Sequence, residues 1–182
     1  MKRSRLQLFW ILIVVCIAFD QWIKFWARTN LNIGESWRGG PWHGVFEFTL
    51  TYNKGIAFGM FQGTALLMAP IALLMSGYAI YTVYKSPNET KWSTAALGFL
   101  AAGALGNLID RVANPRGVTD MFLVRLSNIT GGKLNDFPVF NIADSCITVA
   151  MVMLVIAWSR QASDAKDEPE PEPILKTEES SL

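Results

Sequence analysis

Four apolar segments, each close to the length of a membrane-crossing helix, constrain this chain more than any other feature. They cover approximately residues 6–26, 64–84, 92–111 and 143–158. As a helix, the first measures roughly 30 Å, which matches the hydrocarbon core of a bilayer. Of the 182 residues, 51% are hydrophobic and 17% are charged, whereas about a quarter are charged in soluble domains. We therefore predict an all-α polytopic membrane protein, with four transmembrane helices in a single domain of residues 1–160.

A small β-sheet is predicted between the first and second helices, in residues 31–63. Residues 46–53 alternate apolar and polar side chains, which is typical of a half-buried strand. Glycines and Pro41 before this run indicate turns. A second long loop, residues 112–142, follows the third helix. Residues 161–182 are rich in Glu and Pro, a composition typical of a disordered acidic tail.

Four crossings place both termini on the same side of the membrane. The basic residues of the chain are divided evenly between the two sides, so their total does not decide the orientation. Lys2, Arg3 and Arg5 directly precede the first helix, however, and basic residues at this place favour the cytoplasm. We therefore predict cytoplasmic termini and an extracytoplasmic sheet.

Four aspartates fall toward the predicted extracytoplasmic face. Asp20 and Asp110 lie in the far portions of the first and third helices, Asp120 follows the third, and Asp144 begins the fourth. A transporter would more often carry carboxylates at mid-depth, exposed to both sides in turn. A membrane scaffold would not need these residues. Clustering on one side favours chemistry at the membrane surface over a transporter, and a scaffold stays open.

Asp120 and Asp144 could meet if the second long loop folds back. Two adjacent carboxylates cannot both ionise at low cost, so they would share a proton and act as base and acid. Such a pair could activate a water molecule for peptide hydrolysis. Asp144 alone is explained equally well as a helix cap, because a carboxylate there accepts backbone N–H hydrogen bonds.

Gly103, Asn107, Asp110 and Arg111 share one face of the predicted third helix. An ionised side chain at the centre of a membrane helix costs roughly 2.5–3.5 kcal/mol, so the charged pair must lie at the membrane edge, face other helices, or both. Gly103 would let another helix approach closely. This face is either a structural ion pair between helices or the wall of an active site.

Other kinds of site find less support. His43 is the single histidine and lies in a glycine-rich surface segment, and no His-Glu-x-x-His zinc pattern occurs. Cys16 and Cys146 fall in apolar segments and are interpreted as buried structural thiols. Ser145 and Cys146 have no evident base that would activate either as a nucleophile. Nothing in the composition suggests a nucleic-acid partner.

Five short motifs follow one another along residues 6–158. They are Asp20-Gln-x-x-Lys24, Asn53-x-Gly-x-Ala-Phe-Gly59, Gly103-x-x-Gly-Asn-x-x-Asp-Arg111, Val118-x-Asp120 and Phe140-Asn-x-Ala-Asp144. In this order they resemble the lipoprotein signal peptidase family, signal peptidase II. The sequence departs from the family pattern at Thr119 and Met121, where more apolar residues are expected, and residues 125–138 match no motif.

The resemblance implies a bacterial aspartic endopeptidase of the inner membrane, which cuts prolipoproteins directly before a cysteine that carries diacylglycerol. It implies no metal and no organic cofactor. Its partners would be diacylglyceryl-prolipoproteins and membrane lipids, and we expect a monomer. By the motif match Asp120 and Asp144 correspond to the catalytic pair. Positions lining the substrate pocket are Asn53, Gly55, Asn107, Arg111 and Asn141, and supporting positions are Asp20, Lys24 and Asp110.

Overall fold

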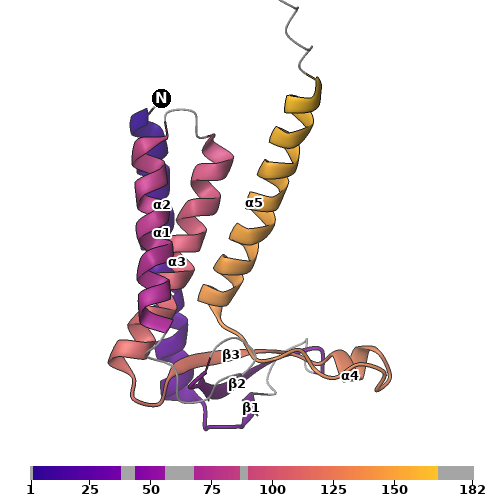
Figure 1. Ribbon diagram of the computed structural model, residues 1–182. Helices are drawn as coiled ribbons and strands as arrows, with labels where there is room; N and C mark the ends of the chain where they lie inside the picture. Colours follow the sequence, from indigo (N-terminus) through magenta and orange to yellow (C-terminus); the bar gives the residue numbers. More distant parts are fainter. Residues whose placement is uncertain (1, 38–43, 56–67, 87–89, 168–182) are drawn as a thin grey trace, which may run out of the picture.

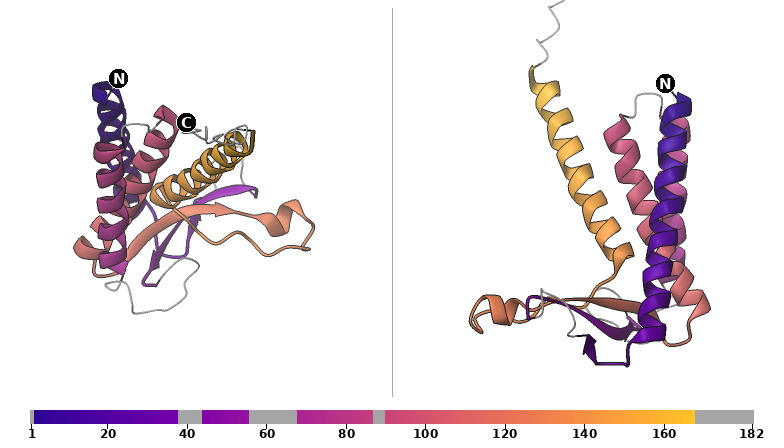
Figure 2. Two further views of the ribbon diagram at one scale, coloured as in Figure 1. Left: turned by 45° about the horizontal axis from the view of Figure 1, so that its top comes forward. Right: turned by 180° about the vertical axis from the view of Figure 1, so that it is seen from behind.

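A computed structural model of the chain describes residues 2–37, 44–55, 68–86 and 90–167, and shows a bundle of helices standing on a small sheet (Figure 1). The long helices are α1 (Lys2–Asn30), α2 (Met68–Lys85), α3 (Lys91–Ala113) and α5 (Ile142–Asp167). The strands β1 (Ser36–Trp37), β2 (Phe46–Asn53) and β3 (Val118–Val124) lie across one end of the bundle (Figure 2). The short helix α4 (Leu126–Ile129) extends to the side. The start of α1 and the end of α5 lie at the opposite end, as four crossings would require (Figure 1).

Three helical segments are long and apolar enough to cross a membrane, namely Arg3–Asn30, Lys91–Ala113 and Ile142–Gln161. They confirm a mostly helical membrane protein. The fourth predicted crossing corresponds to α2, of which residues 64–67 lie outside the described residues. Within the described ranges α2 is not among the segments that meet this criterion, so its crossing stays a prediction.

The bundle helices extend beyond their apolar segments. α1 covers Lys2–Asn30 instead of residues 6–26, and α5 continues to Asp167. A disordered tail is predicted from residue 161, and this is wrong for residues 161–167. This stretch contains no glycine or proline, and the helix ends just before Pro169, a residue that cannot continue it. The rest of the predicted tail lies outside the described residues.

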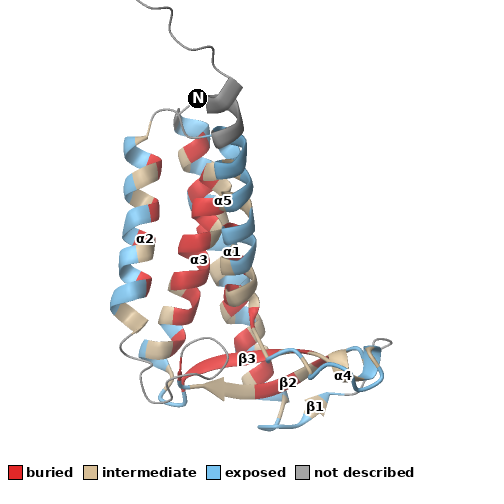
Figure 3. Cartoon of the chain, turned by 45° about the vertical axis from the view of Figure 1, so that its right-hand side comes forward, coloured by how far each residue is buried: buried red, intermediate tan, exposed pale blue. Residues whose placement is uncertain are grey.

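The helix α3 forms the centre of the bundle and contacts α1, α2 and α5 (Figure 3). Its buried residues are mostly alanine and glycine, which allow the neighbouring backbones to come close. A Cβ atom at Gly103 would overlap the carbonyl oxygen of Ala143 and lie 2.7 Å from Ile147 Cγ1. Glycine therefore permits the contact that brings the beginning of α5 against α3. The prediction that this face of the helix contacts protein is confirmed.

The sheet is antiparallel in the order β1-β2-β3, and its central strand occupies residues 46–53 as predicted. In β2 and β3, Phe46 lies opposite Val124 and Asn53 lies opposite Val118. Gly117 precedes β3 with φ of 104°, and a Cβ atom there would lie only 2.5 Å from the carbonyl oxygen of Asn53. A residue with a side chain would therefore push the two strands apart where β3 begins.

The origin of β3 corrects the predicted location of the sheet. The sheet is not confined to the segment between the first two helices, because β3 comes from the second long loop, after α3. Residues 118–121 are all buried, so this strand lacks the alternation that revealed β2. Phe122 packs 5.5 Å from Phe48, measured between ring centroids. Met121 packs with Leu50 and with Ala27 of α1, which fixes the sheet to the end of the bundle.

Candidate active site

Asp120 and Asp144 line the same cavity, at the junction between the sheet and the bundle. Asp120 lies on β3, and Asp144 lies in the first turn of α5. The cavity has a volume of about 690 Å³, and Asn53, Asn107 and Arg111 are among its polar walls. The second long loop therefore folds back as the pairing of the two carboxylates requires. The apolar walls come from α2, α3, β3, α5 and residues 137–140, and include Ile71, Ala72, Met75, Ala104, Val118 and Ile147.

Asn141 connects the two carboxylates and is completely buried. Its Nδ2 donates to Asp120 Oδ1 at 2.6 Å, and its backbone N–H donates to Asp144 Oδ2 at 3.2 Å. Its Oδ1 in turn accepts from the backbone N–H of Asp144 at 2.9 Å. Reciprocal bonds of this kind form a capping box at the start of a helix. Asp144 is therefore a helix cap and a wall of the cavity at once, so the two interpretations of this residue are compatible.

Asn107 holds Asp144 from the other side. Its Nδ2 donates to Asp144 Oδ1 at 2.8 Å. Its Oδ1 accepts from Lys24 Nζ and from Asn141 Nδ2, both at 3.1 Å. Because Lys24 can only donate, it fixes which end of the Asn107 amide is oxygen, and hence which end faces Asp144. Both oxygens of Asp144 consequently accept N–H hydrogen bonds, an environment that suits a carboxylate.

The Asp120 carboxyl is protonated far more readily than an ordinary aspartate. Only 3% of the residue is exposed. This burial, with the charge of Asp144 as the second cause, raises the pKa of Asp120 from 3.8 to about 8. Hydrogen bonds from the side chains of Asn141 and Asn53 oppose the rise in this pKa. At neutral pH Asp120 is therefore the member of the pair that can carry a proton.

A buried charge network supports the cavity from behind. Lys24 is fully buried, and its Nζ lies 2.8 Å from Asp20 Oδ2 and 3.8 Å from Asp110 Oδ2. Asp20 and Asp110 are 1% and 2% exposed, so neither carboxylate can rely on water. Since Lys24 also binds Asn107, the network joins α1 and α3 directly to the side chain that orients Asp144.

Asp20 also completes the beginning of α5. Its Oδ1 accepts from the backbone N–H of Ala143 at 2.9 Å, although the two residues are 123 positions apart. A carboxylate at a helix N-terminus interacts favourably with the helix dipole as well as with the free N–H groups. Gly106 makes room for it, because a Cβ atom there would lie 2.9 Å from Asp20 Oδ2. The helix that carries Asp144 is thus capped by a residue of α1.

Arg28 and Thr119 anchor β3 next to Asp120, and the sequence did not identify Arg28. Asp110 Oδ2 accepts from the Thr119 backbone N–H at 2.7 Å. Arg28 Nη1 donates to Asp110 Oδ1 at 3.3 Å and to Thr119 Oγ1 at 2.9 Å. Arg28 follows Lys24 by one helical turn, as Lys24 follows Asp20, and this i,i+4 series was the signal available in the sequence.

The remaining predicted pocket residues differ in their contacts with the two carboxylates. The Asn53 side chain hydrogen-bonds Asp120, and its Oδ1 accepts from the backbone N–H of Gly55 at 2.9 Å, which makes a tight turn after β2. Arg111 lines the cavity, while neighbouring Asp110 is buried behind it. Among the described residues Arg111 Nε has no hydrogen-bond partner. Asp110 is therefore the residue that joins helices through ion pairs, and Arg111 the one that faces the cavity.

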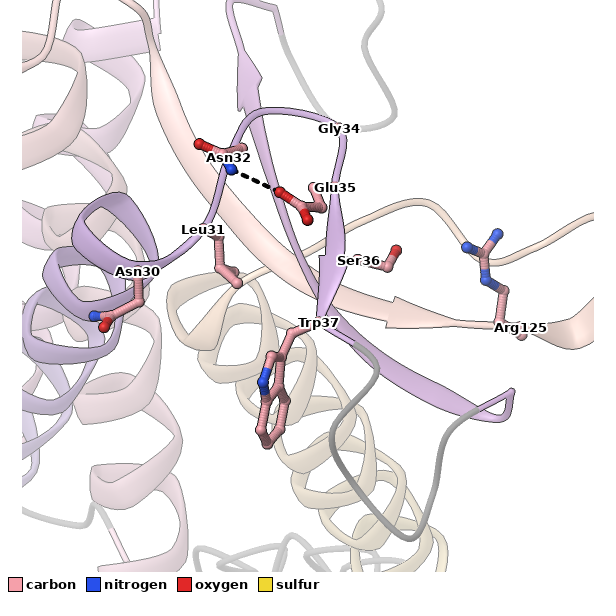
Figure 4. Close-up of a pocket in the computed structure, with 8 residues that line it drawn as sticks. All are labelled: Asn30, Leu31, Asn32, Gly34, Glu35, Ser36, Trp37 and Arg125. Carbon is pink, nitrogen blue, oxygen red and sulfur yellow. Dashed lines mark hydrogen bonds between the residues drawn. The ribbon is translucent and has the colours of Figure 1, made fainter.

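A second hollow lies at the β1 edge of the sheet and at the end of α1 (Figure 4). It is larger, about 800 Å³, but its single lining carboxylate is Glu35, which accepts from Asn32 Nδ2 at 2.7 Å. A lone carboxylate offers no acid–base pair. Within the described part of the chain no group of three or more His, Cys, Asp or Glu could hold a metal ion. The cavity with Asp120 and Asp144 is therefore the candidate active site.

Known proteins resemble this chain over most of its length. A family model described as Signal peptidase (SPase) II matches residues 12–160. A lipoprotein signal peptidase of Deinococcus radiodurans is 35% identical over 150 residues, which cover 81% of this chain and 76% of that protein. One of Streptococcus pyogenes serotype M6 is 34% identical over 156 residues, covering 85% and 95% of the two chains.

Two solved structures have the same fold. Both are bacterial membrane enzymes determined by the in meso method, at 2.3 Å and 1.9 Å resolution. The first has a TM-score of 0.74 and 30% identity, covering 91% of this chain and 93% of its own. The second has a TM-score of 0.69 and 31% identity, covering 82% and 91%.

Proposed function

The chain belongs to the signal peptidase II family, and on this basis we propose that it is an aspartic endopeptidase of the bacterial inner membrane. It removes the signal peptide from diacylglyceryl-modified prolipoproteins by cutting before the lipidated cysteine. Asp120 and Asp144 are the catalytic pair. The observation that carries this proposal is that Asn141 hydrogen-bonds both carboxylates within one cavity.

The two carboxylates take different parts because their surroundings differ. Asp144, whose oxygens both accept N–H bonds, is the ionised member and takes a proton from a water molecule. Asp120, with its raised pKa, is the protonated member and donates to the oxygen of the scissile carbonyl. The water oxygen bonds to the carbonyl carbon and gives a neutral tetrahedral diol. As the diol collapses and the C–N bond breaks, Asp144 gives its proton to the departing amine nitrogen and Asp120 takes a proton from a diol hydroxyl. Asp120 is then protonated and Asp144 ionised, as at the start.

The walls of the cavity suit a substrate that is partly lipid and partly peptide. Arg111 offers a forked donor for carbonyl or lipid oxygens, and Asn53 and Asn107 offer amide groups. The apolar walls on α2 and α5 suit acyl chains and apolar side chains. A separate hollow, lined by Leu97, Leu100 and other residues of α2, α3 and α5, lies between these helices nearer their other ends. This hollow offers a place for the apolar segment of a signal peptide.

The orientation follows from the positions of these features. The basic residues before the first crossing favour cytoplasmic termini, and the sheet and both aspartates lie at the opposite end of the bundle. The active site therefore faces the extracytoplasmic side, where exported prolipoproteins arrive. One chain already brings both aspartates into one cavity, so a monomer suffices for the proposed activity.

The test is cleavage of a diacylglyceryl-modified prolipoprotein by the purified protein in lipid nanodiscs. Asp120→Asn and Asp144→Asn should each abolish release of the signal peptide, and the double variant should be no worse than either, because residues that act as a unit are not additive. Asn30→Ala, on the outer surface of α1, is the control and should keep full activity. Substantial cleavage by a folded Asp120→Asn or Asp144→Asn variant would exclude the aspartic mechanism.

A further inference from the structure

After β3 the chain leaves the sheet over residues 125–136, called the excursion here, and then returns alongside β3. Residues 137–140, called the return strand here, run antiparallel to β3. The Phe137 N–H donates to the Val124 carbonyl at 3.0 Å, and the Phe140 N–H donates to the Phe122 carbonyl at 3.0 Å. The Phe122 N–H donates back to the Phe140 carbonyl at 2.8 Å. The return strand is thus a further edge of the sheet, beyond β3.

The outer edge of the return strand has backbone groups without partners. Phe137 and Phe140 both bond β3 although they are three residues apart, so this segment does not alternate regularly. Val139 lies between them and makes no backbone hydrogen bond to β3. The N–H and C=O of Val139 have no hydrogen-bond partner among the described residues. Pro138 has no N–H, so Val139 is the residue of this edge that can both donate and accept.

This edge borders the candidate active site, and the excursion holds it firmly. All four residues of the return strand line the cavity that contains Asp120 and Asp144. The excursion is closed by Arg125, whose Nη1 donates to Asp136 Oδ2 at 2.8 Å. The same guanidinium donates through Nε and Nη2 to the buried Glu47 of β2, at 3.1 Å and 2.9 Å. This ion-pair cluster of Arg125, Asp136 and Glu47 fixes the position of Asp136, the residue directly before the return strand.

We propose that the substrate residues next to the scissile bond bind in extended form along the return strand, as an added β-strand paired with Val139. The Val139 N–H donates to a substrate carbonyl, and the Val139 carbonyl accepts from the N–H of the same substrate residue. Main-chain pairing of this kind provides affinity without reading side chains. It would let one enzyme accept prolipoproteins of different sequence. The inference rests on the proposed peptidase function and adds a recognition site to it.

The first test is kinetic and uses Val139→Pro beside Val139→Ala, with the same lipidated substrate. The proline variant loses the N–H donor of the edge and has a fixed φ, whereas the alanine variant keeps the N–H and loses part of the side chain. Loss of one hydrogen bond should raise KM about fivefold in Val139→Pro. The value of kcat should change less than KM does, and Val139→Ala, which keeps the N–H, should raise KM less than Val139→Pro. Equal KM values for the two folded variants would overturn the proposal.

The second test does not depend on a change at Val139. In the full-length Asp120→Asn chain, amide hydrogen exchange is followed with and without bound lipidated peptide. The Val139 N–H should exchange at least about tenfold more slowly when peptide is bound, because it then has a partner. The Phe137 and Phe140 amides, already bonded to β3, serve as internal controls and should change little. Unchanged exchange at Val139 with peptide bound would refute the pairing.

Failure of the proposed function and failure of the pairing at Val139 give different results. If wild-type protein does not cleave lipidated prolipoprotein, the proposed function is wrong and the pairing has no basis. If wild-type protein cleaves it while Val139 is insensitive in both tests, the function stands and the inference alone is wrong.

Discussion

Alkaline pH should inactivate the protein by removing the proton that Asp120 is proposed to donate. Burial raises the pKa of this carboxyl to about 8, and the nearby charge of Asp144 adds to the effect. Above this pKa both members of the pair are ionised. Neither can then protonate the scissile carbonyl, although a base to deprotonate water is still available.

The size of the effect follows from the pKa. The competent fraction should be about one half at pH 8, and between pH 7 and pH 9 it should fall about tenfold. The hydrogen bond from Asn53 lowers the pKa of Asp120. Its removal in Asn53→Ala should move the alkaline limb upward by about 0.7 pH unit, if the bond contributes about 1 kcal/mol. Asn30→Ala, distant from the cavity, should leave the limb unchanged.

The assay is the initial rate of signal-peptide release from lipidated substrate in nanodiscs, measured between pH 5 and pH 10 at low substrate concentration. Under these conditions the profile reports kcat/KM and hence the titration of the free enzyme. Samples returned from pH 9.5 to pH 7 should recover their rate, which separates titration from denaturation. A rate that stays constant up to pH 9.5, with recovery intact, would refute the assignment of Asp120 as the proton donor.

The same pKa shift has a consequence for stability, with a definite sign. The pKa of Asp120 is raised from 3.8 in the folded protein, so the folded state binds the proton more tightly than the unfolded state. This contribution is complete below about pH 4 and is lost as the pH rises through about 8. The thermal midpoint of the wild type should therefore decline between pH 5 and pH 9 more than that of Asp120→Asn. Parallel declines in the two proteins would contradict the shift.

Three further outcomes are expected. Arg111→Lys should lower turnover at least about tenfold with the protein still folded, because an ammonium cannot replace a forked donor; wild-type activity would refute its contact with substrate. Gly103→Ala should lower the thermal midpoint and the activity, because the new Cβ overlaps the start of α5, whereas Gly77→Ala, with open space around it, should lower neither. A cysteine replacing the exposed Leu134 should react with an impermeant thiol reagent in intact spheroplasts, and one replacing Gln161 should not; the reverse pattern would overturn the orientation.

The sequence predicted the features whose cause is local. The apolar segments gave the helices, because length and hydropathy alone decide whether a helix suits a bilayer. The strand at residues 46–53 was visible because it alternates, with one face toward the core. Asp120 and Asp144 could be proposed as a pair because each stands beside an apolar segment with which a charge is incompatible.

The features that were missed depend on contacts between distant parts of the chain. β3 is buried over residues 118–121, so its pattern does not distinguish it from other apolar runs. Asn141 was expected to line the pocket, but its simultaneous bonds to Asp120 and Asp144 require the folded arrangement of β3 and α5. The partner of Arg125 could not be identified, because Glu47 lies 78 positions away on another strand.

The cap that Asp20 provides for α5 has a consequence for biogenesis. α1 leaves the ribosome well before α5, yet the N–H of Ala143 finds its acceptor on α1. A nascent chain that has inserted every helix but has not docked the last against the first keeps an unfinished helix end beside Asp144. In such an intermediate the carboxylate pair of the proposed site is not yet ordered. The proposed peptidase activity would therefore appear only when α5 docks against α1.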